Sequence, residues 1–127
     1  MEFYFPTELG EQLAFLSAAT MSLIGCFILF APGITLNILG LVRRDERPEG
    51  LGAARSVGGL IIGFSATAIL LAQPIVYLAF GSALGLAAFG RVLSLMSDRG
   101  GTWRGVLFLV VEAVLAALPL AYVFGLI

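Results

Sequence analysis

The stretch GFSATAILLAQPIVYLAFGSALGLAAFG, residues 63–90, contains no charged side chain, and the pair Gln73–Pro74 lies near its middle. A helix that crosses a membrane needs about 20 consecutive apolar residues. The stretch therefore joins the end of one membrane span to the beginning of the next. Because the turn between them is so short, we expect the two spans to form an antiparallel helical hairpin.

The rest of the chain extends this pattern to four apolar spans, over residues 9–31, 51–73, 75–97 and 105–127. The 127 residues are 60% hydrophobic and 12% charged, whereas soluble domains carry roughly 25% charged residues. Backbone groups in lipid must find partners within the protein, which favours helices, and these runs lack the alternation of membrane β-strands. The sequence predicts one all-α integral membrane domain over residues 1–127, an antiparallel four-helix bundle.

The positions of the basic residues predict the orientation of this bundle. Five arginines lie in or beside the loops that follow the first and third spans: Arg43, Arg44, Arg47, Arg99 and Arg104. The N-terminal segment, the Gln73–Pro74 turn and the C-terminal end carry no basic residue. Because basic loops stay in the cytoplasm, we expect both termini outside and a location in the bacterial inner (cytoplasmic) membrane. The acidic N-terminal segment is unlike a secretion signal, so we expect the first span to be retained.

Three charged residues lie inside the spans rather than in the loops. At 1.5 Å per residue, Arg91, Arg55 and Glu112 lie about 10, 8 and 12 Å from the cytoplasmic ends of their spans. A single charge at such a depth costs a few kcal/mol, so each should find a partner or reach water. We expect the three to meet as an intramembrane ion network or ligand site, with Asp98 and Ser94 as further polar partners.

Two plainer interpretations compete with a functional site. A long arginine side chain near the end of a span can extend to the membrane surface without a specific partner. A buried ion pair can also be purely structural and fix how the helices pack. The sequence leaves these interpretations open beside a ligand-binding or proton-linked site.

Small residues recur at four-residue spacing within the spans, a pattern that allows the backbones of membrane helices to approach closely. The main interpretation is packing within one bundle, and the alternative is contact between copies of the chain. We expect helix packing at six glycines: Gly58, Gly59, Gly63, Gly81, Gly85 and Gly90.

Three segments carry a resemblance to a known family: GAARSVGGLIIG (52–63), FGRVLSLMSDRG (89–100) and VLFLVVEAVLA (106–116). Together they resemble the small bacterial membrane family catalogued as domain of unknown function 4345, and more distantly the DoxX-like four-helix membrane proteins. The positions that match the family pattern are Arg55, Gly58, Gly59, Gly90, Arg91, Ser94, Asp98 and Glu112. Val57 stands where the family often has an aromatic residue, and Arg99 intervenes before Gly100. The resemblance implies a four-helix membrane fold and these polar positions, but no reaction.

The residue types exclude several kinds of chemistry. The chain has no His and a single Cys, so haem ligation by paired imidazoles, iron–sulfur sites and His-dependent nucleophilic catalysis have no residues to use. We expect no metal, no cofactor, no catalytic residue and no binding of nucleic acid. The expected partners are membrane lipids, with anionic headgroups at the arginine-rich cytoplasmic face, and a larger membrane complex or a second copy of the chain.

Three functions from different classes fit these observations. The favoured one is a non-catalytic accessory subunit or a membrane protein that binds a lipid or another hydrophobic molecule. The alternative is a small oligomeric transporter. A membrane enzyme that uses Arg/Glu acid–base chemistry is the least favoured.

Overall fold

The computed structural model describes residues 6–41, 48–97 and 103–126. These residues form five helices and no strand: α1 (Leu9–Phe30), α2 (Pro32–Leu39), α3 (Glu49–Leu71), α4 (Pro74–Ser97) and α5 (Trp103–Val123). All but α2 are long and apolar enough to cross a membrane. The expected all-α membrane bundle with four spanning helices is therefore confirmed.

The connection between α3 and α4 is as short as the sequence predicts. Ala72 ends α3 in the left-handed conformation, with φ of 51°, and its N–H still bonds to the carbonyl of Ala68 at 3.0 Å. Pro74 then begins α4, where its fixed φ suits a first helical turn and its missing N–H is no loss. The two helices therefore reverse direction within Ala72 and Gln73.

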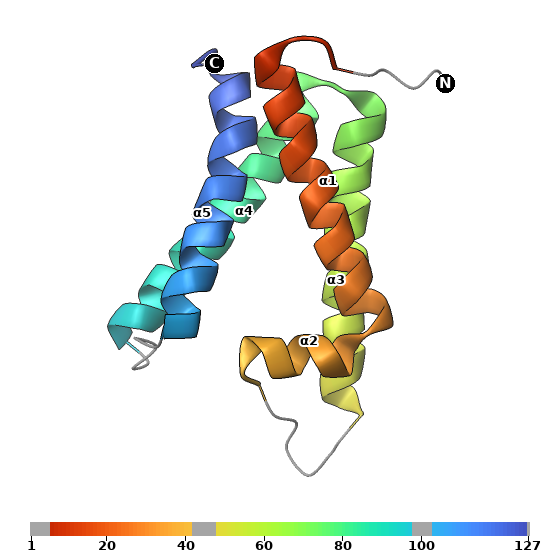
Figure 1. The fold of residues 1–127 in the computed structure, drawn as a ribbon, viewed down its shortest axis with the longest axis vertical. Coiled ribbons are helices and arrows are strands. Elements are labelled where there is room, and N and C mark those ends of the chain that lie inside the picture. The colour runs from red at the N-terminus through yellow and green to blue at the C-terminus, as the bar shows by residue number, and fades with distance from the viewer. Residues whose placement is uncertain (1–5, 42–47, 98–102, 127) are drawn as a thin grey trace.

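Helix α2 is an element that the sequence analysis did not predict. Pro32 has no N–H to continue the hydrogen bonds of α1, so α1 ends at Phe30 and the chain turns. The eight residues of α2 then run across the molecule, in a direction different from those of the spanning helices (Figure 1). Gly40 ends α2 with φ of 80°, and the N–H of Leu41 reaches back to the carbonyl of Leu36 at 2.8 Å, a common way to end a helix.

The four spanning helices form two pairs, α1 with α3 and α4 with α5. The pairs meet near the end where the described chain begins and where α5 ends, and they separate towards the other end, so that the ribbon has the shape of an inverted V (Figure 1). A hydrogen bond fastens them where they meet, because Ser17 Oγ of α1 donates to the carbonyl of Leu115 of α5 at 2.5 Å. Most of the buried core lies in this upper part, with Ala14, Ala18, Met21, Ala68, Tyr77, Phe80, Leu84, Leu115 and Ala116.

Close backbone approach holds α1 against α3. A Cβ added to Gly58 would lie 2.7 Å from the backbone nitrogen of Leu29 and 2.8 Å from the carbonyl oxygen of Gly25. One side-chain bond reinforces the contact, between the hydroxyls of Ser22 and Ser65 at 2.7 Å. Gly81 has a comparable role between α4 and α5, where an added Cβ would lie 2.8 Å from Leu120 Cγ.

The other expected packing glycines lie away from these contacts. A Cβ added to Gly59, Gly63, Gly85 or Gly90 would meet nothing within 4 Å beyond its own helix in the described chain. On α3 the face against α1 carries Gly58 and Ser65, and the next residue along a helix is rotated by about 100°. Gly59 therefore faces outwards, and Gly63 follows it four residues on.

Candidate functional site

An ion pair between the two helices of the α4–α5 pair is the centre of the site. Arg91 Nε donates to Glu112 Oε1 at 2.8 Å. Arg91 lies six residues before the end of α4 and Glu112 nine residues after the start of α5, about 9 and 13 Å along the two helices. Because α4 and α5 are antiparallel, these distances are measured from the same end of the molecule, and the two charges meet well inside the span.

A second contact orients the arginine. The guanidinium carbon of Arg91 lies 5.3 Å from the ring centre of Phe108, within the range of a cation–π interaction. Phe108 precedes Glu112 by four residues, so both side chains lie on the same face of α5. One helix face thus provides a carboxylate and an aromatic ring for the same guanidinium.

The pair leaves polar atoms without partners. Glu112 Oε2 is buried and accepts no hydrogen bond in the described chain. Arg91 uses Nε for the ion pair, and no acceptor for Nη1 or Nη2 is found among the described residues. The side chains of Arg91 and Glu112 retain 34% and 22% of their accessible surface, so the arginine is the more accessible of the two.

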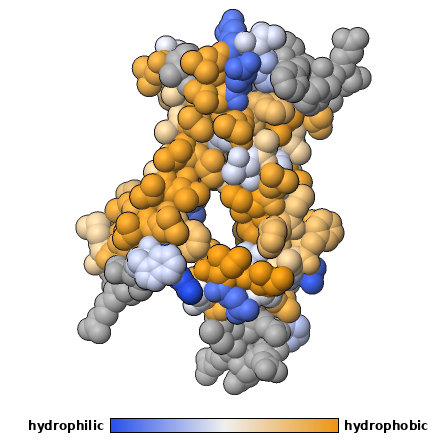
Figure 2. Space-filling model, viewed as in Figure 1, coloured by the Kyte–Doolittle hydropathy of each residue, from blue (hydrophilic) through white to orange (hydrophobic). Residues whose placement is uncertain are grey.

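The ion pair lies beside an opening in the molecule. Glu112 is only three residues from Leu115, whose carbonyl accepts the bond from Ser17 of α1. Beyond this bond α1 and α5 separate, and Figure 2 shows a gap through the space-filling surface between the two helix pairs. We name this gap the interhelical opening. The Arg91–Glu112 ion pair therefore lies about one helical turn from the narrow end of the opening, which we call its apex.

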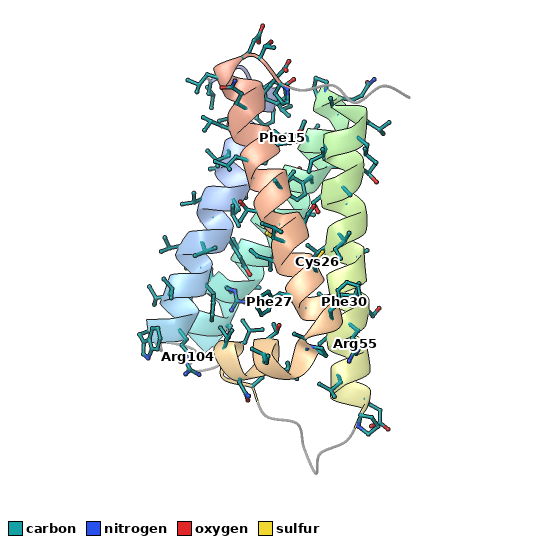
Figure 3. The ribbon with its side chains drawn as sticks, turned by 45° about the vertical axis from the view of Figure 1, so that its right-hand side comes forward. Phe15, Cys26, Phe27, Phe30, Arg55 and Arg104 are labelled. Carbon is teal, nitrogen blue, oxygen red and sulfur yellow. The ribbon has the colours of Figure 1, made fainter. Side chains whose placement is uncertain are left out.

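The walls of the interhelical opening are apolar. On α1, the face that carries Ser17 continues seven and eleven residues later with Ile24 and Ile28, which are partly buried, and Ile28 also borders Gly58 of α3. On α5, the face that carries Leu115 continues with Val111 and Phe108, four and seven residues earlier. Phe27 projects from α1 at the rim, on the side towards α4 and α5 (Figure 3). Figure 2 shows hydrophobic residues on both sides of the opening.

Helix α2 closes the opening at its wide end. It begins directly after α1, and its C-terminal Gly40 reaches the first turn of α5, where Arg104 Nη1 would lie 2.7 Å from a Cβ added to that glycine. The guanidinium carbon of Arg104 also lies 5.5 Å from the ring centre of Trp103. A cation near the C-terminal end of a helix is electrostatically favourable. α2 and Arg104 together thus bridge the two helix pairs.

Arg55 does not join the ion pair, contrary to the expectation from its depth. Its Nη1 donates to the carbonyl of Leu29 in the last turn of α1 at 2.8 Å. Carbonyls in the last turn of a helix lack partners within that helix. Arg55 therefore satisfies the end of α1 and belongs to the α1–α3 pair, because its helix face is that of Gly58, three residues further along.

The remaining expected site residues contribute less. Ser94 lies three residues after Arg91 on α4, is partly buried, and has no hydrogen bond among the described residues. Asp98 lies outside the described residues. Within residues 6–41, 48–97 and 103–126, no three His, Cys, Asp or Glu side chains are placed to hold a metal ion.

Several residues of the site were missed by the sequence analysis. Phe108 and Val111 carry a local signal, since Phe108 lies one turn before Glu112 on the same helix and Val111 is next to Glu112 in the sequence. Ile24, Phe27 and Ile28 carry no such signal, because an apolar side chain in a spanning helix suits lipid equally well.

Comparisons with protein-family models, curated proteins and solved structures found no match to this chain. The site is therefore interpreted from its own geometry.

Proposed function

We propose that this protein is a non-catalytic membrane protein that holds an apolar molecule, taken from the bilayer, in the interhelical opening. We further propose that it lies in the bacterial inner membrane with both termini outside, so that α2 and the loop after it face the cytoplasm. A resemblance to the family catalogued as domain of unknown function 4345 is compatible with this role, since that family implies no reaction.

One observation carries the proposal: the opening has apolar walls and a single ion pair near its apex. Binding sites for small molecules are typically concave and mostly apolar, with a few polar groups that fix orientation. Ile24, Ile28, Phe108 and Val111 supply the apolar walls, and Arg91 supplies an accessible polar group. An apolar molecule would gain contacts with both helix pairs at once.

The same geometry argues against catalysis at this place. General acid–base chemistry needs a group that can exchange a proton with the substrate. Glu112 is already bonded to Arg91 through Oε1, and its Oε2 is buried. The apolar side chains on the described walls of α1 and α5 offer no nucleophile. Binding without reaction is the simplest use of the site.

A pair of neighbouring substitutions on α5 tests the proposal. Val111 follows the wall of the opening and is 38% exposed, whereas Val110 is rotated by about 100° and is 53% exposed. Val111→Trp adds bulk inside the opening, and Val110→Trp adds the same bulk on the lipid-facing side. Each protein would be purified in mild detergent and analysed by native mass spectrometry for small molecules that remain bound.

We expect wild type and Val110→Trp to retain a bound apolar molecule and Val111→Trp to lose it. Thermal unfolding in the same detergent shows whether both variants remain folded. Equal retention by two folded variants would contradict binding in the opening, and so would the absence of any bound molecule from wild type after titration with a long-chain hydrocarbon.

A further inference from the structure

We infer that the molecule held in the interhelical opening is an electrically neutral lipid-like compound with a carbonyl oxygen. Its oxygen accepts hydrogen bonds from the Nη atoms of Arg91, which have no acceptor among the described residues. The inference rests on the proposed function and deepens it, because it names the chemical class of the ligand. The inference follows from the hydrogen-bond donors and acceptors of the ion pair that have no partner in the described chain, and from the zero net charge of the pair.

The first argument concerns hydrogen bonding. Arg91 donates from Nε to Glu112, and within the described chain Nη1 and Nη2 have no acceptor. The side chain retains 34% of its surface, so a ligand atom can reach the guanidinium. An arginine offers donors only and no acceptor. The complementary ligand atom is therefore an acceptor.

The second argument separates a carbonyl from a hydroxyl. A hydroxyl both accepts and donates, so a ligand hydroxyl beside Arg91 would need an acceptor for its own hydrogen. The carboxylate oxygen that the ion pair leaves unused within the described chain, Glu112 Oε2, is buried and out of reach of a ligand. A carbonyl or ester oxygen needs only donors and is satisfied by Arg91 alone.

The third argument separates a neutral ligand from an anion. Arg91 and Glu112 neutralise one another, so an anionic group bound beside them would leave one uncompensated negative charge inside the span. Uncompensated charge at this depth in a membrane is unfavourable. A neutral ester or ketone adds no charge, and the apolar walls formed by Ile24, Ile28, Phe108 and Val111 then contact the rest of the molecule.

Three probes with the same hydrocarbon chain test the inference: methyl oleate, oleate at pH 8, and 9-octadecene. Each is titrated into protein stripped of bound lipid, and the bound fraction is measured by native mass spectrometry. We expect methyl oleate to bind about fivefold more tightly than 9-octadecene, the gain from one net hydrogen bond. Oleate should bind no more tightly than the hydrocarbon.

A double variant and a blocking variant identify the source of this preference. Arg91→Leu/Glu112→Leu removes both charges together and should bind ester and hydrocarbon equally. Val111→Trp should reduce binding of all three probes. The thermal shift of wild-type protein by each probe gives the same ranking independently of whether the double variant folds.

The outcomes distinguish this inference from the proposed function. Tighter binding of oleate than of the ester would overturn the neutral ligand, and equal binding of ester and hydrocarbon by wild type would overturn the role of Arg91. In either case a loss of binding in Val111→Trp would still support the proposed function. Probe binding that Val111→Trp leaves unchanged would overturn both.

Discussion

Arg91 of α4 and Glu112 of α5 lie 2.8 Å apart, joined from Nε to Oε1, in the part of each helix that is expected to lie within the membrane. No other salt bridge joins two helices in the described chain. Arg91 also lies over Phe108, so its side chain is held by α5 at two points. This arrangement neutralises two charges that would each be costly alone.

The ion pair predicts a non-additive effect on stability. Glu112→Leu should destabilise the protein by about 3 kcal/mol, the lower end of the range for breaking a buried pair, because both side chains keep part of their surface. Arg91→Leu should have a similar cost, since it strands the carboxylate. The double change should cost less than the sum, because no uncompensated charge remains. Unfolding in mixed micelles, measured for all four proteins of the cycle, checks this, and additive losses would show that the pair is not coupled.

Substitution of Arg55 should affect stability independently of Glu112, in contrast to substitution of Arg91. Its bond to the Leu29 carbonyl stabilises the end of α1, so Arg55→Leu should cost about 1.5 kcal/mol, the lower end of the range for a hydrogen bond to a charged group, because Arg55 is exposed. Because Arg55 shares no partner with Glu112, the two losses should add within about 0.5 kcal/mol. A coupling energy well above this value, measured in the same micelles, would place Arg55 in the ion network after all.

The neighbours Gly58 and Gly59 provide a matched test of helix packing. A methyl group at Gly58 would press against the backbone of α1 at Leu29 and Gly25, so Gly58→Ala should cost about 1–3 kcal/mol, the range for overpacking. Gly59→Ala meets open space and should not destabilise the protein, and the higher helix propensity of Ala should stabilise it by up to about 1 kcal/mol. Thermal unfolding in detergent measures both. Equal sensitivity of the two positions would show that the face of Gly59 also packs, for example against a second copy of the chain.

The proposed orientation is tested by cysteine accessibility. Cys26, the single cysteine of the chain, is first replaced by Ser, and new cysteines are introduced singly as Glu2→Cys and Glu46→Cys. A membrane-impermeant thiol reagent added to intact cells should label the first variant but not the second, because basic loops remain in the cytoplasm. Labelling of both in permeabilised cells is the control. The reverse pattern would invert the topology and place α2 on the outer side.

Positions along the helix axes could be predicted from the sequence. The four spans are predicted by runs of apolar residues, and the antiparallel hairpin of α3 and α4 is predicted by the short Gln73–Pro74 connection between two of these runs. The depths of Arg91 and Glu112 follow from a constant rise per residue, and in the structure the two side chains meet. Even the end of α1 has a local signal, since Pro32 cannot continue the hydrogen bonds of the helix.

Rotation about those axes was decided only by the tertiary structure. In a soluble helix a polar face and an apolar face show which side packs. In a membrane helix the lipid and the protein interior are both apolar, so the sequence does not distinguish the two sides. Gly58 and Gly59 therefore look alike in sequence, although only Gly58 contacts α1. The sequence likewise does not show that Arg55 points towards the end of α1 rather than towards Arg91 and Glu112, because the depth of Arg55 in the membrane matches that of Arg91. The separation of the two helix pairs depends on where α1 and α5 stop touching beyond Ser17 and Leu115. These two residues are 98 positions apart and are joined by a hydrogen bond from the Ser17 hydroxyl to the Leu115 carbonyl, a contact that no local pattern encodes.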